Sequence, residues 1–538
     1  MLSSPGADGA ALRCVLGGPP GVGKSTVGRA AAAALGWRSI DLDEVVEAEA
    51  GVTIARLFER DGEAAFRERE RAALRQALRH ERVVISVGGG ALVDRTMRRE
   101  ALRCARVVTL RAPAATLRER LAGGADRPLL KRSAGALEAL LEARRAVYAE
   151  AHAEVDAGGP VEAVASTVAA LARSAAPMVV PLGERSYRVH VGPLRGLAGE
   201  VASRSIAVLV TDATVARHWG DAAAIALGGS AARVVLRPGE RSKTLRSVAR
   251  VWDAAGARGA DRRGVIACVG GGVVTDVGGF AASTWLRGVP YVSVPTSLLA
   301  MVDASVGGKT GVDLPAGKNL VGTFHQPSLV WIDPAVLATL APGHYRAALS
   351  EVVKIAAVRD AELLSWLESN ATALGSRPTA EALAPGGVVE SMIRRAVQAK
   401  IDVVAEDERE SGVRALLNFG HTVGHALESA TGFTHFLHGE AVALGMVSAL
   451  QLSTRVSGLA ASELQRIEDL FTRHGLETRT GAAEAEDVLR YLSMDKKVEA
   501  EGAVWVLTRR LGTATVAGQV PEGAVRAAVS YILEEPAA

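Results

Sequence analysis

The chain has 538 residues, a length that corresponds to roughly three to four domain-sized units. Its 62 lysines and arginines nearly balance 59 aspartates and glutamates, and a net charge of +3 gives no electrostatic case for a nucleic-acid partner. An apolar fraction of 49% with 22% charged residues is typical of a globular protein. Three separated cysteines predict neither a disulfide framework nor a metal site, and no apolar run reaches the ~18 residues of a membrane span. The N-terminus lacks the basic stretch of a signal peptide, so we expect a soluble, cytoplasmic chain.

Alternating strand-like and helical segments predict two enzyme-sized parts. Residues 1–172 read as a βαβ series, and an Ala/Ser/Pro segment predicts a linker at 173–177. Strand-like runs return over 178–341, and a mainly helical pattern fills 342–538. The expected fold class is α/β: a parallel sheet with helices first, then an α/β part that a helical C-terminal part completes.

A phosphate-binding loop opens the first part. Residues 18–25 match GxxxxGK[ST] and lie between an apolar strand-like run and a helical pattern. Glycines let the backbone N–H groups surround a phosphate, while the helix N-terminus adds a favourable dipole. Lys24 would reach the outer phosphates and Ser25 would hold Mg²⁺. The predicted nucleotide site comprises Gly21, Val22, Gly23, Lys24, Ser25 and Thr26.

DLDE at 41–44 follows the run WRSI, so Asp41 and Asp43 are expected on one face at a strand end. Further motifs follow in the same part: FRxxE at 66–70, three glycines at 88–90, DRPLLKR at 126–132, and Arg144 four residues before Tyr148. Each alone is equally typical of a solvated charge or a turn. Their order and spacing resemble the shikimate kinase family over residues 1–172. Gluconate- and nucleoside-monophosphate-type kinases share the loop and are the competing interpretation.

The resemblance assigns roles to these residues. It implies that Asp41 helps to place Mg²⁺ with ATP, and that Arg127 belongs to a lid that closes over ATP and takes part in catalysis with Lys24. Paired arginines suit a carboxylate substrate because each guanidinium can bind it through two hydrogen bonds. The shikimate contacts are expected to be Asp43, Arg67, Gly89 and Arg144.

The second part lacks GxGxxG. Its glycine run GGGVVTDVGGF at 270–280 follows the apolar run VIACV and allows a pyrophosphate to approach the backbone, although tight packing explains it as well. Around it stand PGERSK at 238–243, a polar and glycine-rich segment at 295–327, LSEVVKIA around Glu351, NFGHTVGHALE at 418–428 and LHGEAVALGM at 437–446.

This ordered set resembles 3-dehydroquinate synthase over residues 178–538. The resemblance implies an NAD- and Zn²⁺-dependent carbon–oxygen lyase, with Co²⁺ as the alternative metal. Such an enzyme closes 3-deoxy-D-arabino-heptulosonate 7-phosphate to 3-dehydroquinate, releases phosphate, and regenerates its NAD within one turnover. PTS at 295–297 stands where PTT is usual, which keeps a hydroxyl group.

The resemblance also supplies three sets of site residues. The zinc ligands are expected to be Glu351, His421 and His438. NAD is expected to contact Asp212, Glu240, Lys243, Gly271, Gly272, Asp276, Thr296 and Ser297. The substrate contacts are expected to be Arg287, Asp303, Lys309, Lys318, Asn319, Lys354, Lys400, Arg414, Asn418, His425 and Lys496, with Lys497 as the alternative to the last. Within that set, Lys309, Lys354, Lys400, Arg414 and His425 are expected to serve catalysis.

Spacing alone gives a different pair of histidine ligands. His421 and His425 lie four residues apart and so share one helical face. The resemblance instead selects His438 and leaves His425 in the pocket for the departing phosphate or a proton transfer.

We therefore expect a bifunctional enzyme of chorismate and aromatic amino-acid biosynthesis, with small-molecule substrates, no nucleic-acid or membrane partner, and a homodimer formed through the synthase half. The two reactions are not consecutive in that route, so no channelling between the sites is expected. The alternative is a small-molecule kinase fused to a metal-dependent polyol dehydrogenase or to another sugar-phosphate cyclase. A polyol dehydrogenase would accumulate NADH, whereas a synthase would not.

Overall fold

The computed structural model describes residues 12–122, 135–315, 317–495 and 505–533. Two compact units make up the chain, residues 1–190 and 191–538. The predicted linker at 173–177 lies within the first unit, where Ser174 and Ala175 accept hydrogen bonds from the buried Arg106. In the described ranges, no helix has both the length and the apolarity needed to cross a membrane.

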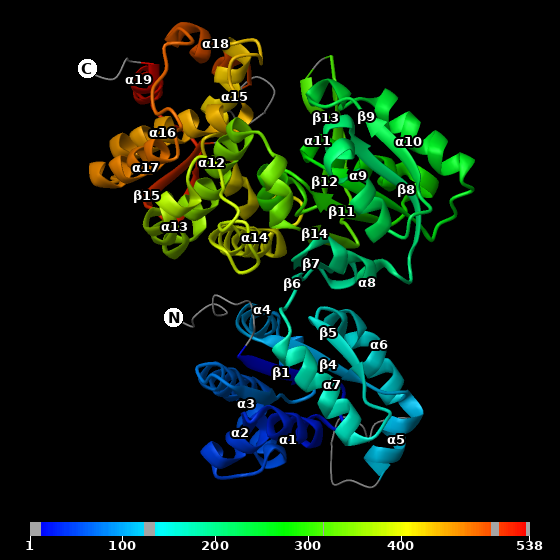
Figure 1. Cartoon of the computed structure of the whole chain (residues 1–538). Coiled ribbons are helices and arrows are strands. Elements are labelled where there is room, and N and C mark those ends of the chain that lie inside the picture. The colour runs from blue at the N-terminus through cyan, green and yellow to red at the C-terminus, as the bar shows by residue number, and fades with distance from the viewer. Residues whose placement is uncertain (1–11, 123–134, 316, 496–504, 534–538) are drawn as a thin grey trace. The chain divides into compact units, whose positions relative to one another are not determined.

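A five-stranded parallel sheet with helices packed around it forms the first unit (Figure 1). The strand order is β2-β3-β1-β4-β5. The strands are β1 (Arg13–Gly17), β2 (Arg38–Asp41), β3 (Val83–Ser86), β4 (Arg106–Arg111) and β5 (Ala153–Asp156). The helices are α1 (Lys24–Leu35), α2 (Leu42–Ala50), α3 (Ile54–Ala77), α4 (Arg95–Cys104), α5 (Ala114–Ala122), α6 (Ala136–Ala149) and α7 (Val161–Arg173).

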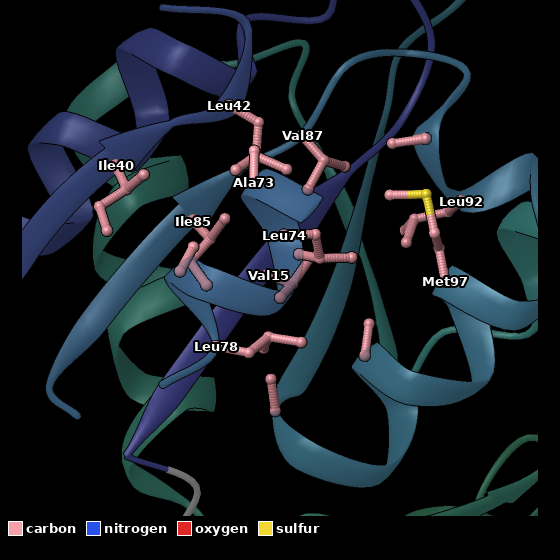
Figure 2. Close-up of a cluster of buried hydrophobic side chains, with 14 of the residues drawn as sticks. Val15, Ile40, Leu42, Ala73, Leu74, Leu78, Ile85, Val87, Leu92 and Met97 are labelled. Atoms are coloured by element: carbon pink, nitrogen blue, oxygen red, sulfur yellow. The ribbon is translucent and has the colours of Figure 1, made fainter. Parts of the chain in front are cut away.

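Both faces of this sheet are buried. Successive residues of a strand point to opposite faces, so Val15 and Ile85 belong to one apolar cluster while Cys14 and Leu16 belong to the other. Figure 2 shows the first cluster, in which Leu74 of α3 lies against the strand residues. Because both faces are covered, the strands are apolar at consecutive positions, as expected of a parallel sheet between helices.

Five parallel strands in the order β14-β11-β10-β8-β9 form the α/β part of the second unit. Helices α10 and α11 pack on one face and α8 and α9 on the other. The strands are β8 (Ser205–Asp212), β9 (Ala232–Leu236), β10 (Gly264–Gly270), β11 (Tyr291–Pro295) and β14 (Leu329–Ile332). The helices are α8 (Leu197–Val201), α9 (Ala213–Ala226), α10 (Leu245–Ala257) and α11 (Gly272–Thr284).

Three antiparallel hairpins and several short helical turns connect these layers. The hairpins pair β6 (Met178–Val180) with β7 (Tyr187–Val191), β12 (Lys309–Leu314) with β13 (Gly317–Phe324), and β15 (Trp505–Arg510) with β16 (Thr513–Ala517). The first hairpin lies where strand-like runs were predicted to return, after residue 178. Short turns lie at η1 (Ala91–Val93), η2 (Gly183–Arg185), η3 (Leu194–Gly196), η4 (Glu240–Ser242), η5 (Trp285–Arg287), η6 (Ala300–Ala304), η7 (Pro334–Thr339) and η8 (Val413–Asn418).

The remainder of the second unit is mainly helical, as predicted. Its helices are α12 (Pro342–Arg359), α13 (Ala361–Leu374), α14 (Val388–Glu406), α15 (His421–Ala430), α16 (His438–Val456), α17 (Ala461–Arg473), α18 (Ala485–Asp495) and α19 (Glu522–Leu533). Helix α12 is buried at nearly every position from Tyr345 to Val358, which makes it the centre of this part.

Glycines let three of these helices pack backbone against backbone. A Cβ atom at Gly439 would lie 1.9 Å from the carbonyl oxygen of Ala347 in α12. A Cβ atom at Gly445 would lie 2.0 Å from the carbonyl oxygen of Gly420, directly before α15. Because neither position has room for a side chain, α16 packs closely against α12 and α15. The start of α16, at His438, is thereby held beside the middle of α12.

Candidate active sites

The predicted phosphate loop joins β1 to α1. Gly18, Gly21 and Gly23 adopt positive φ angles of 134°, 80° and 97°, and a Cβ atom at Gly18 would lie 2.4 Å from the carbonyl oxygen of Leu110. Lys24 begins α1, and its Nζ donates to the carbonyl oxygens of Gly18 and Pro19 at 3.0 Å each. The ammonium group is therefore held over the loop where a phosphate would bind.

Three glycines after β3 gather the side chains that the resemblance assigns to shikimate. A Cβ atom at Gly88 would lie 2.9 Å from Asp43 Oδ1 and 2.7 Å from Glu70 Oε1, and one at Gly90 would lie 2.6 Å from a guanidinium nitrogen of Arg67. Arg67 in turn donates to Glu70 at 2.7 Å. The glycines thus allow two carboxylates and one guanidinium to lie directly against the main chain.

Helix α6 completes the same site from another direction. Arg144 Nη1 and the Tyr148 hydroxyl donate to the carbonyl oxygen of Gly89 at 2.5 and 3.1 Å. Gly89 also packs against Pro20 of the phosphate loop, with 3.2 Å from its ideal Cβ position to the ring. The predicted shikimate residues Asp43, Arg67, Gly89 and Arg144 therefore converge next to the predicted nucleotide loop. A cavity of about 380 Å³, lined in part by Tyr148, adjoins them.

Two acidic residues in this site have distinct environments. Asp41 ends β2, as predicted, and caps α2 by accepting from the Asp43 N–H at 3.0 Å. The predicted strand-end position of Asp43 is wrong, because this residue lies in the first turn of α2. Burial raises the pKa of Glu70, although its ion pair with Arg67 opposes that shift. Raised pKa values of this kind mark carboxylates taken out of water inside a site.

In the second unit, the glycine run begins at the end of β10, as predicted, and Gly271 caps α11. Thr296 N–H donates to the carbonyl oxygen of Gly270 at 3.0 Å, and the ideal Cβ position at Gly271 is 3.4 Å from Ser297 Oγ. These residues place main-chain groups at the carboxyl ends of neighbouring parallel strands, where α/β sheets bind their ligands. Asp212 ends β8 and caps α9 through the Thr214 and Val215 N–H groups.

Lys243 joins several of the predicted cofactor residues. Its Nζ lies 2.7 Å from Asp276 Oδ2 and 3.9 Å from Glu240 Oε1, and it donates to the Asn319 side chain. Burial raises the pKa of Asp276 to about 6 against the opposing charge of Lys243. For Lys243, burial lowers the pKa, but Asp276 outweighs it, so the ammonium form is favoured.

Lys400 and Asp303 form a second pair between distant segments. Lys400 in α14 donates to the carboxylate and main-chain carbonyl of Asp303 in η6, 97 residues away in the sequence. Burial lowers the pKa of Lys400 to about 8, while Asp303 opposes the shift. Although burial disfavours its charge, the carboxylate of Asp303 keeps a pKa below the usual value because Lys400 and Lys354 lie nearby.

The predicted metal residues come together from three helices. His421 and His425 on α15 and His438 on α16 have ring nitrogens within 4.8 Å of one another. Glu351 of α12 approaches them, with its Oε1 3.7 Å from His421 Nε2. It also pairs with Lys354, one turn further along α12. The four residues of both alternative ligand sets therefore lie in one cluster.

Hydrogen bonds distinguish the histidines. His421 Nδ1 lies 3.3 Å from the Phe419 carbonyl oxygen and His438 Nδ1 lies 3.2 Å from Glu428 Oε2, which leaves Nε2 of each ring for a metal. Of the two buried oxygens of Glu351, Oε2 is paired with Lys354, and Oε1 accepts no hydrogen bond from the described residues. A carboxylate and two oriented imidazoles fit Zn²⁺. Burial, followed by the charge of Lys354, lowers the pKa of His421 well below its usual value, so this ring is neutral, as a metal ligand must be.

Other predicted substrate residues join the start of β12 to η8 and to the segment before it. Lys309 pairs with Glu410, which also accepts from Asn418 Nδ2 at 3.3 Å. Arg414 is 2% exposed and donates to the main-chain carbonyls of Glu408 and, at 3.1 Å, Gly307. It therefore braces the turn before Lys309, and its direct contact with substrate stays a prediction.

Some predicted residues are not joined to either site by the contacts of the described chain. Arg287 ends η5 with a φ of 66°, and no contact found within the described ranges links it to the histidine cluster. Arg127, Lys496 and Lys497 lie outside the described residues.

Sequence reasoning missed two carboxylates. Glu428 lies seven residues after His421, on the same face of α15, and this helical spacing could have revealed it. Glu410 precedes η8 with a φ of 59°, and nothing in the local pattern indicates its contacts with Lys309 and Asn418.

Comparisons with known proteins agree with this geometry. The shikimate kinase family model matches residues 20–172, and the N- and C-terminal 3-dehydroquinate synthase models match 233–347 and 348–498. The 3-dehydroquinate synthase of Microcystis aeruginosa is 43% identical over 359 residues, which are 65% of this chain and 97% of that protein. That of Halorhodospira halophila is 45% identical over 343 residues, 63% and 95% of the two chains.

Solved structures give the same class. A 2-epi-5-epi-valiolone synthase from Streptomyces hygroscopicus with NAD⁺ and Zn²⁺ bound is 33% identical, with a TM-score of 0.58, over 64% of this chain and 96% of that one. A 2-deoxy-scyllo-inosose synthase complexed with carbaglucose-6-phosphate, NAD⁺ and Co²⁺ is 25% identical, with a TM-score of 0.59, over 66% and 100%.

The fold and sites thus define a P-loop kinase joined to an enzyme of the dehydroquinate-synthase-like class. The chain belongs to the 3-dehydroquinate synthase family, and its first unit carries a shikimate kinase domain. The chain therefore combines shikimate kinase and 3-dehydroquinate synthase, as predicted. The predicted α/β fold class is also confirmed.

Proposed function

We propose that the first unit transfers a phosphoryl group from ATP to shikimate and that the second cyclises 3-deoxy-D-arabino-heptulosonate 7-phosphate with release of phosphate. The observation that supports the second activity best is the cluster of three imidazoles and a buried carboxylate beside Lys354. A pocket with a metal-type ligand set and several ammonium groups suits a substrate that carries hydroxyls, a carboxylate and a phosphate.

In the kinase site, the chain's own groups position two anions. Lys24 and the loop N–H groups would hold the outer phosphates, while Ser25 and Asp41 would hold Mg²⁺. Arg67 and Arg144 would bind the shikimate carboxylate. Asp43 would accept a hydrogen bond from a substrate hydroxyl, which aligns it with the phosphoryl group.

For the synthase site, the proposed cofactors are NAD and Zn²⁺, the latter held by Glu351, His421 and His438. When bound, NAD would accept and return a hydride while Zn²⁺ acts as a Lewis acid on substrate oxygens. Lys354 and Lys400 place positive charge next to the proposed zinc ligands and Asp303, respectively. His425, which is exposed, would face the departing phosphate.

The test is an assay of phosphate release from the heptulosonate phosphate, with and without NAD and a chelator. We expect release to need both NAD and metal, with no accumulation of NADH. Steady NADH formation would favour a polyol dehydrogenase, and release only from other sugar phosphates would favour another cyclase. ADP formation that depends on shikimate, and not on gluconate or a nucleoside monophosphate, tests the kinase.

The remaining proposals concern assembly and location. A homodimer through the synthase half rests on the family resemblance and is tested by light scattering on the full chain and on residues 191–538. A cytoplasmic location rests on the use of ATP and NAD, and fractionation of cells tests it.

A further inference from the structure

Glu428 lies where it can act on the proposed metal site without being a ligand. It is 5% exposed, and its two carboxylate oxygens have different partners: Oε2 is 3.2 Å from His438 Nδ1, and Oε1 is 3.5 Å from Lys318 Nζ. We propose that Glu428 is a positioning residue that fixes the tautomer and orientation of His438 for metal binding, and that Lys318 moderates this effect. The inference rests on the zinc site proposed above.

The first part of the argument is the chemistry of the imidazole ring. A neutral histidine has one N–H donor and one lone pair, and the group that accepts from one nitrogen decides which nitrogen is left for a metal. With Nδ1–H donated to Glu428, the lone pair of His438 is on Nε2. A carboxylate also makes the ring a stronger ligand than a main-chain carbonyl does, as at His421, because it stabilises positive charge on the ring.

The second part is the position of Lys318. Its ammonium group also lies 4.5 Å from the ring centroid of Phe433, whose N–H donates to the Glu428 carbonyl oxygen at 2.7 Å. Lys318 therefore neutralises part of the charge that Glu428 offers to His438. The next residue, Asn319, is bound to Lys243 among the predicted NAD contacts. Strand β13 thus reaches the cofactor side and the metal side through adjacent residues.

A purely structural role for Glu428 makes different predictions. If the Glu428 carboxylate only joins α15 to β13 through its ion pair with Lys318, loss of either side chain should lower the melting temperature of the metal-free protein. Zinc affinity would then change little. If it positions His438, removal of Glu428 and removal of Lys318 should shift zinc affinity in opposite directions.

The experiment uses the full chain, stripped of metal, with zinc dissociation constants measured by competition against a chromophoric chelator. We expect Glu428→Ala to weaken zinc binding by about 10- to 100-fold, the usual effect of removing a group that orients a ligand. Glu428→Gln keeps a hydrogen-bond acceptor but loses the charge, so its affinity should lie between those of Glu428→Ala and wild type. Lys318→Met should bind zinc more tightly than wild type, because Glu428 then offers its full charge to His438.

A control variant and further measurements separate positioning from folding. Glu410→Gln removes a charge from the same region, where its partners are Lys309 and Asn418, and should leave zinc affinity unchanged. The visible absorption of bound Co²⁺ should change in Glu428→Ala, and excess zinc should restore part of its turnover. Melting temperatures of the metal-free variants should stay close to that of wild type.

The outcomes are distinguishable. Wild-type-like affinity in Glu428→Ala, or equal losses in Glu428→Ala and Lys318→Met, would overturn the positioning role while leaving the proposed zinc site intact. A wild-type chain that binds no zinc would overturn the proposed cofactor and this inference with it.

Discussion

Two ligand sets compete for the metal in the histidine cluster, and substitution can separate them. The resemblance selects Glu351, His421 and His438. The three imidazoles that lie together in the structure form a second possible set, which has His425 in place of Glu351. We predict that His438→Ala and Glu351→Gln lose zinc, and that His425→Ala keeps it while losing most of its phosphate-release activity.

The size of the effect follows from the number of ligands. Four-ligand zinc sites bind with ~10–16 kcal/mol, or roughly 2.5–4 kcal/mol per ligand. At ~1.4 kcal/mol per tenfold change, loss of one ligand should weaken zinc by roughly 10²- to 10³-fold. Glutamine is the chosen substitution at Glu351 because Lys354 is 3% exposed and would otherwise be left buried without an acceptor.

The assay is metal analysis of each purified variant, followed by chelator competition. His425→Ala should purify with near-stoichiometric zinc and an affinity within about threefold of wild type. A zinc-free His425→Ala beside a zinc-replete Glu351→Gln would refute the assignment and favour the three-histidine set. Loss of zinc in both variants would indicate four protein ligands and would also contradict it.

Three further predictions concern the first unit. Lys24→Met should lower the rate of ATP-dependent shikimate phosphorylation by about two to three powers of ten, while phosphate release by the second unit continues. Loss of both activities would contradict the independence of the two sites. Burial, followed by the charges of Arg106 and Arg188, lowers the pKa of His152 from 6.5 to about 3. Between these pH values the unfolded chain binds more protons than the folded one, so stability should fall as the pH falls through this window, and His152→Asn should flatten that dependence in urea unfolding at stepped pH. A chain that ends at residue 172 lacks the Ser174 and Ala175 oxygens that accept hydrogen bonds from Arg106. Its free energy of unfolding should be ~1–3 kcal/mol lower than that of a chain that ends at residue 176. Equal melting temperatures of the two chains would refute this.

Local patterns predicted the parts of the sites that lie within one segment. The phosphate loop could be predicted because its glycines, Lys24 and Ser25 act within eight consecutive residues. The glycine run after β10 could be predicted because an apolar strand and a helix flank it directly. In such motifs the chemistry depends on backbone conformation, which neighbouring residues largely determine.

Pairings across the fold could not be predicted from local pattern. Lys400 meets Asp303 because α14 packs against η6, and Glu351 meets His421 because α16 packs against both α12 and α15. Family resemblance supplied these residues, but not their partners. The position of Asp43 was misjudged because α2 begins at Leu42, directly after the strand, so alternation along β2 does not extend to it.

The contact between Gly439 and α12 determines which positions in this site can vary. Real Cβ atoms essentially never approach another atom closer than 3.0 Å, so a methyl group at 439 would force the α12 backbone to move by more than an ångström. This main-chain contact therefore sets how far apart α12 and α16 hold Glu351 and His438, two of the proposed metal ligands. Gly439, which has no side chain, thus determines the distance between these two proposed ligands. A redesign for a larger ion would begin at this glycine, before any ligand is replaced.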